Sequence, residues 1–174
     1  MFPFSPKTIS LLALLALLAA LQNLQPILAQ PRAISWNAKS NVAIVLPQNA
    51  SLPEQTAAQE LDDYLTKITD GEFSVQPETE AGRTPGAIYV GDTQFAKGVG
   101  VVGSTLAPEE WRIVSKNGNL VLIGGSARGT LYTAYHFLED VAGVRWWNPW
   151  EETVPTLGVL PMPEMDVRGK PIFS

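Results

Sequence analysis

The chain has 174 residues, a formal net charge of −5, one histidine and no cysteine. This length favours one domain, and the lack of thiols excludes disulfides and thiolate metal sites. The acidic balance argues against nucleic acid as a partner, because a negative surface does not attract a phosphate backbone.

The first 29 residues have the pattern of a secretory signal peptide. Lys7 supplies a positive charge, residues 9–21 form an apolar run, and Pro26 and Ala29 supply a helix break and a small residue. A membrane anchor is the alternative, but this run is too short to cross about 30 Å of hydrocarbon. No cysteine follows that could carry a lipid. We therefore expect cleavage after Ala29 and a secreted or periplasmic product.

Residues 30–154 are expected to form the folded domain, beginning with a strand at 41–46. Ser51 and Glu54 have the spacing of a capping box, which predicts the start of a helix. The apolar stripe of this helix is expected to be Ala57, Leu61, Tyr64, Leu65 and Ile68. Short strands are predicted at 72–76 and 87–90, and the glycine-rich residues 93–103 are assigned to a loop with at most one helical turn.

Residues 111–150 carry the strongest pattern in the chain. Alternation predicts a strand at 111–115, and Asn117-Gly118 predicts a tight hairpin into the apolar run 120–123, which we expect to be buried on both faces. Ser126 is a candidate N-cap for a second helix that begins near Gly129 and ends at Gly143. The expected apolar stripe of this helix is Leu131, Ala134, Tyr135, Leu138 and Val141.

This order of elements predicts an α+β fold, with a single mixed β-sheet and two helices packed on one face. Residues 155–174 contain three prolines beyond the one at position 155. That composition is typical of an extended linker or an edge segment, and we assign these residues to a Pro-rich linker.

Few residues are candidates for chemistry. The lone His136 lacks the partners of a zinc site or a catalytic triad, so a structural role is expected. Residues 124–129 (GGSARG) read as a strand-to-helix turn with a capping serine, although an anion-binding loop is the alternative. Arg128 in this turn is a candidate to hold a carboxylate of a neighbouring domain.

The acidic pairs do not have the arrangement of a catalytic general acid and base. Glu139 and Asp140 are adjacent on a helix, and Glu151 and Glu152 are adjacent in extended chain, so each pair is expected to diverge. The remaining candidates are three tryptophans, whose rings either pack against another domain or stack on sugars. They are Trp146, Trp147 and Trp150.

The block GGSARGTLYTAYHFLEDVAGVRWWNP (124–149), together with AAQELDDYLTKITDG (57–71) and IYVGD (88–92), resembles a known family. It is similar to the non-catalytic N-terminal domain of glycoside hydrolases, as found before the barrel of α-glucuronidases and as the second domain of β-hexosaminidases. The likeness is closest to a related uncharacterised domain that precedes glycosidase barrels, and it covers most of the chain beyond Ser40.

The resemblance implies an exported accessory domain in polysaccharide degradation, without catalytic residues, cofactor or metal of its own. Catalysis would belong to a (β/α)₈ barrel of about 250 residues that follows 155–174 and is absent from these 174 residues. A truncated gene product and a domain that acts alone both remain open. A stand-alone secreted carbohydrate-binding module is the alternative, and a small enzyme in its own right is a third hypothesis.

Overall fold

A computed structural model describes residues 34–81, 85–162 and 164–171 of the chain. The expected signal peptide, residues 1–29, lies outside the described residues. None of the helices within the described ranges is long and apolar enough to cross a membrane.

The centre of the domain is a mixed six-stranded sheet in the order β10-β5-β6-β4-β2-β3. Four strands run parallel to one another: β2 (Asn41–Leu46), β3 (Glu72–Pro77), β4 (Ile88–Val90) and β6 (Asn119–Gly124). Two further strands continue the sheet: β5 (Trp111–Lys116) lies antiparallel to β6, and β10 (Asp166–Gly169) lies antiparallel to β5. Asn117 and Gly118 both have positive φ, so the predicted Asn-Gly hairpin between β5 and β6 is confirmed.

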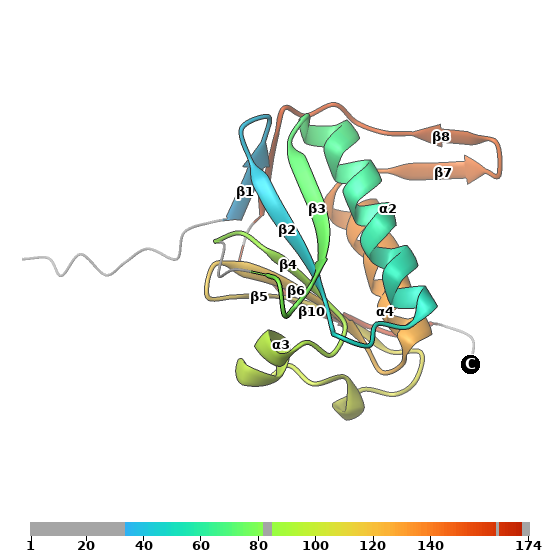
Figure 1. Cartoon of the computed structure of the whole chain (residues 1–174). Coiled ribbons are helices and arrows are strands. Elements are labelled where there is room, and N and C mark those ends of the chain that lie inside the picture. The colour runs from blue at the N-terminus through green and yellow to red at the C-terminus, as the bar shows by residue number, and fades with distance from the viewer. Residues whose placement is uncertain (1–33, 82–84, 163, 172–174) are drawn as a thin grey trace, which may run out of the picture. The chain divides into compact units, whose positions relative to one another are not determined.

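Two long helices cover one face of this sheet, as predicted (Figure 1). They are α2 (Leu52–Thr69) and α4 (Ala127–His136), and the whole fold is α+β. The predicted stripe of α2 is buried, and the Glu54 carboxylate accepts the Ser51 amide at 2.8 Å, the return bond of the capping box. Asp70 ends α2 in the left-handed region.

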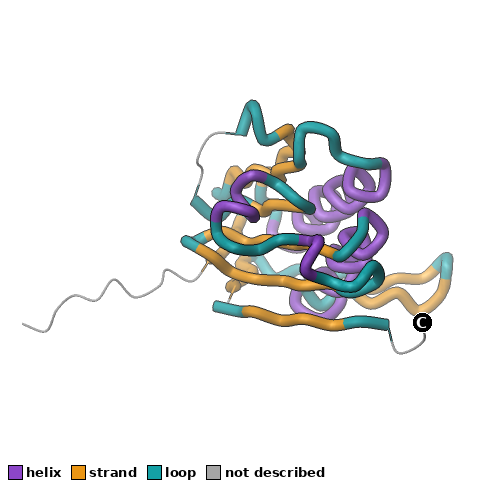
Figure 2. Tube along the Cα trace, turned by 90° about the horizontal axis from the view of Figure 1, so that it is seen from below, coloured by secondary structure: helices purple, strands orange, loops and turns teal. Residues whose placement is uncertain are grey.

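The opposite face is covered by α3 (Gln94–Gly98) and the 3₁₀ turn η1 (Gly103–Thr105), which cross the sheet in Figure 2. A second cluster of buried side chains lies beneath them, and it includes Val45, Tyr89, Ala96 and Val121. Because successive side chains of β2 and β6 point to opposite faces of the sheet, these strands contribute to two separate hydrophobic cores.

The buried face of α4 is rotated from its predicted stripe. Leu131, Tyr135 and Val141 are only half-buried, whereas Thr130 and Thr133 are buried. Thr133 donates to the Ile123 carbonyl at 3.1 Å, and Thr130 accepts the Gly124 amide at 3.1 Å. Hydroxyls are tolerated here because they bond the end of β6, which apolar periodicity cannot anticipate. The helix then ends in a π turn, η2 (Phe137–Val141).

The assignment of residues 155–174 to a linker, and of the domain end to residue 154, needs correction. Strand β9 (Val159–Met162) pairs with β1 (Ile34–Asn37), and β10 forms an edge of the main sheet. Leu160 and Met162 are buried, so part of this segment belongs to the core. The domain therefore continues to at least Gly169.

Candidate functional site: a tryptophan hairpin

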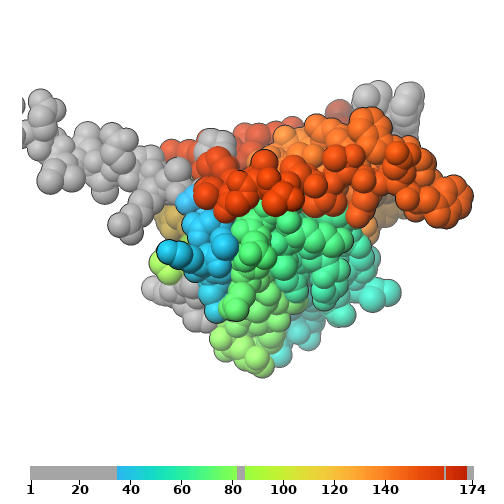
Figure 3. Space-filling model, turned by 90° about the horizontal axis from the view of Figure 1, so that it is seen from above, coloured from blue at the N-terminus to red at the C-terminus, as the bar shows by residue number. Residues whose placement is uncertain are grey.

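A small two-stranded sheet leaves the body of the domain after η2. Its strands are β7 (Arg145–Asn148) and β8 (Glu151–Thr153), which pair antiparallel with a register shift between Trp146 and Asn148. Figures 1 and 3 show this hairpin extending beyond α2. Asn148 closes its turn, because its side chain accepts the Trp150 amide at 2.9 Å and donates to Glu151 at 3.1 Å.

Two indoles of the hairpin are open to solvent. Trp150 is 92% exposed and Trp147 is 65% exposed, although the Trp147 Nε1 donates to Thr153 Oγ1 at 3.0 Å. Large apolar side chains gathered at one projecting tip mark an interaction surface more often than scattered ones do. The tip of the hairpin is therefore the main candidate binding surface.

The third tryptophan fastens the hairpin to the helices. Trp146 is half-buried, and its ring meets Tyr64 and Tyr135 edge-to-face at centroid distances of 5.4 and 5.5 Å. Its Nε1 donates to the Tyr64 hydroxyl at 2.9 Å, and that hydroxyl donates to the Glu152 carboxylate. One hydroxyl of α2 thus connects both strands of the hairpin.

Burial, followed by the bond to Glu152, raises the pKa of Tyr64 to about 12. The hydroxyl therefore keeps its proton at neutral pH and remains a donor. Burial also raises the pKa of Glu60, with smaller contributions from Asp63 and Glu152. Carboxylates thus crowd the base of the hairpin.

The acidic pairs named from the sequence do not face each other across a cleft. Glu151 bonds Asn148 in the turn, whereas Glu152 bonds Tyr64 on α2. Asp140 lies 3.2 Å from His136 Nδ1. These partners hold the carboxylates as solvated or structural charges, and a general acid/base pair needs two carboxyls aimed at one bond.

His136 packs against an aromatic ring of the sheet. Its ring stacks on Trp111 with centroids 4.3 Å apart and planes 24° apart. The stack joins α4 to β5, so the imidazole serves as a flat packing surface.

The space beside the turn at 124–129 is occupied by other residues of the chain. A Cβ on Gly125 would lie 1.9 Å from the Ala107 carbonyl oxygen, and Ser126 caps α4 by accepting the Gly129 amide at 3.1 Å. This is the strand-to-helix turn that the sequence predicts. Arg128 is exposed and donates to the Tyr132 hydroxyl at 2.7 Å. It lies on the first turn of α4, and the hairpin follows the other end of that helix.

The structure therefore brings the three predicted tryptophans together and leaves Arg128 apart. Tyr64 and Tyr135 were predicted only as members of apolar stripes. The bond between Tyr64 and Trp146 joins residues 82 positions apart, and no local pattern reports such a contact.

Comparison with known proteins identifies the domain. The family model described as "Glycosyl hydrolase family 67 N-terminus" matches residues 28–137, more than half of the chain. The chain belongs to this family. The tryptophan hairpin of this family 67 N-terminal domain begins after the matched residues.

A solved structure has the same fold. It is titled "A novel family GH115 4-O-Methyl-alpha-glucuronidase, BtGH115A, with specificity for decorated arabinogalactans" and matches with a TM-score of 0.57 and 18% identity. The match covers 75% of this chain but only 18% of that protein. A second structure, of a "GH138 enzyme targeting pectin rhamnogalacturonan II", has a TM-score of 0.39 and 16% identity over 59% of this chain and 10% of its own. No curated protein matches this family 67 N-terminal domain.

Proposed function

We propose that this domain is an exported, non-catalytic accessory domain of a glycoside hydrolase that degrades polysaccharides. In this proposal the tryptophan hairpin docks on a separate catalytic (β/α)₈ domain and holds it in place. The family membership supports the glycosidase context, and the N-terminal pattern supports export.

The observation that carries the docking role is the exposure of Trp147 and Trp150 at the end of a hairpin that is fixed at its base. Burying an indole at an interface contributes more than most contacts, and aromatic residues are enriched at such centres. The fixed base limits the freedom that the hairpin would lose on docking, which favours association.

The docking proposal is tested by self-association of the chain without a catalytic partner. Sedimentation across a concentration series is expected to show association in the parent. The double variant Trp147→Ala/Trp150→Ala is expected to stay monomeric with an unchanged far-ultraviolet spectrum. A parent that stays monomeric at every concentration would contradict a docking surface of this kind.

The non-catalytic part has its own test. Incubation of the chain with glucuronoxylan and with chromogenic hexosaminides is expected to release no product. Hydrolysis that disappears in Glu152→Gln would overturn this part and revive the small-enzyme hypothesis. Export predicts that the N-terminal residue of the protein recovered outside the cytoplasm is Gln30.

A stand-alone carbohydrate-binding module is the second candidate, because the same exposed indoles suit stacking on sugar rings. It predicts a saturable shift of tryptophan fluorescence with xylo- or chito-oligosaccharides, lost in Trp150→Ala. Association without any sugar response favours the docking role, and a sugar response from a monomer favours the module.

A further inference from the structure

A hollow on the second face of the sheet lies where the order of strands reverses. After β2 the chain places β3 on one side of it and β4 on the other. Val45 of β2 and Tyr89 of β4 are register partners at this junction, and both line the hollow. Ligands of open α/β sheets bind at such switch points, beyond the carboxyl ends of the strands.

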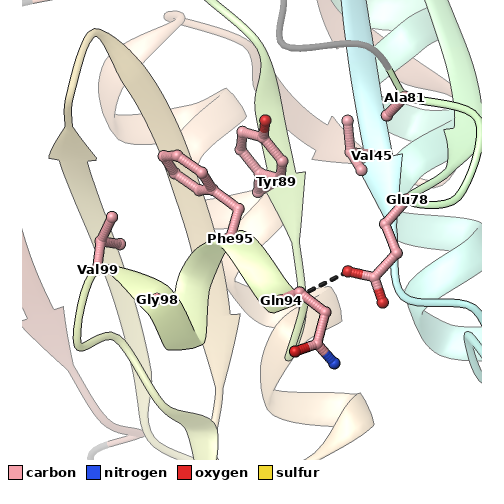
Figure 4. A pocket seen from close by; sticks show the side chains of 8 residues that line it. All are labelled: Val45, Glu78, Ala81, Tyr89, Gln94, Phe95, Gly98 and Val99. Carbon is pink, nitrogen blue, oxygen red and sulfur yellow. Dashed lines mark hydrogen bonds between the residues drawn. The ribbon is translucent and has the colours of Figure 1, made fainter.

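The two walls of the hollow differ in character (Figure 4). The rings of Tyr89 and Phe95 stack with centroids 4.0 Å apart and planes 15° apart, and they form the aromatic wall. Val45 and Ala81 stand on the other side. The hollow has a volume of about 350 Å³, which lies at the lower end of the range for ligand sites.

The polar side chains of its lining are those of Glu78, Gln94 and Tyr89. One oxygen of Glu78 accepts the backbone amide of Gln94 at 2.7 Å, so the carboxylate is held at the edge of the hollow. The second oxygen has no part in that bond. No lysine, arginine or histidine belongs to the lining within the described residues.

We propose that this hollow binds the ring of a neutral sugar. A pyranose presents an apolar C–H face, which suits the aromatic wall, and hydroxyls that can donate to Glu78. A sugar carboxylate would meet the negative charge of Glu78, and the described residues of the lining include no cation to offset it. The site is separate from the tryptophan hairpin and does not depend on the proposed docking role.

The test is an amide-shift titration of the isotope-labelled chain by NMR. The probes are methyl xyloside, methyl glucoside and glucuronate, each added to tens of millimolar. Saturable shifts are expected at residues 94–99 and at Tyr89 with both neutral glycosides and not with glucuronate. Phe95→Leu keeps the apolar volume and is expected to weaken binding by about tenfold, since it removes the aromatic face.

Two further variants keep the proposal falsifiable. Glu78→Gln retains an acceptor for the Gln94 amide but removes the charge, so it is expected to bring glucuronate binding into the measurable range. Trp150→Ala is expected to leave the shifts unchanged, which separates this site from the hairpin. Absence of saturable shifts with the glycosides, shifts confined to residues 145–153, or equal binding of glucuronate to the parent would overturn the proposal.

Discussion

Replacing Tyr64 by phenylalanine is the sharpest test of how the tryptophan hairpin is held. The change removes one oxygen from a side chain that is only 8% exposed, and with it two hydrogen bonds. The Trp146 Nε1–H loses its partner in a half-buried position, and Glu152 loses a donor at the surface. A hydrogen bond contributes about 1 kcal/mol net, and water replaces most of the exposed one. We therefore expect the free energy of unfolding to fall by about 1–2 kcal/mol.

The Tyr64→Phe change should lower the stability of the hairpin itself as well as that of the whole domain. Urea denaturation followed by tryptophan fluorescence measures the free energy of unfolding, and hydrogen exchange at residues 145–153 measures opening of the hairpin. Tyr132→Phe is the matched control, because that hydroxyl accepts from the exposed Arg128 instead of from a half-buried group. The reasoning is refuted if both variants lose equal stability, or if exchange in the hairpin is unchanged in Tyr64→Phe.

The remaining predictions concern Tyr64 at high pH and the C-terminal strand. The pKa of Tyr64 is raised from 10.0 to about 12, so its contribution to the free energy of unfolding should be full below pH 10 and decline as the pH rises toward 12. Thermal melts across this pH range should show the decline in the parent and not in Tyr64→Phe. Gly169→Ala would place a Cβ 2.3 Å from the Trp111 ring, so we expect a loss of about 1–3 kcal/mol, whereas Gly98→Ala, which meets open space, should be near neutral in the same urea titration. Asp166→Asn removes a charge-assisted bond from Arg112 and should cost less than about 1 kcal/mol, because solvent screens the pair. That bond lowers the pKa of Asp166 below 3.8. The difference in thermal stability between Asp166→Asn and the parent should therefore vanish when melts are recorded at pH values below 3.8.

Features that depend on near neighbours in the chain were predictable. The return bond of the Ser51–Glu54 capping box, the Asn117-Gly118 turn and the N-cap at Ser126 all form as the local pattern indicates. Each rests on bonds or backbone angles within a few residues, so tertiary structure has little to add. The stripe of α2 was predictable for a related reason, because its entire face meets the apolar core.

The rotation of α4 shows where periodicity is insufficient. Gly124 and Gly129 let the start of this helix approach β6 so closely that a Cβ on Gly124 would lie 2.1 Å from Gly129. At that distance the threonine hydroxyls can bond the strand, and Thr130 and Thr133 become core residues. Apolar counting assigns such residues to the surface.

Some features of the candidate site were also predictable from the sequence, and others were not. The sequence by itself determined that three tryptophans occur within five residues. Tertiary structure alone decided that Trp146 is fastened by Tyr64 while Trp147 and Trp150 are left exposed. It also decided that 166–169, which composition assigns to an extended linker or an edge segment, becomes a strand, since these residues pair antiparallel with β5 at the edge of the sheet. The physical reason is shared: contacts between residues distant in the chain depend on how the elements pack, and a local sequence window contains no information about that packing.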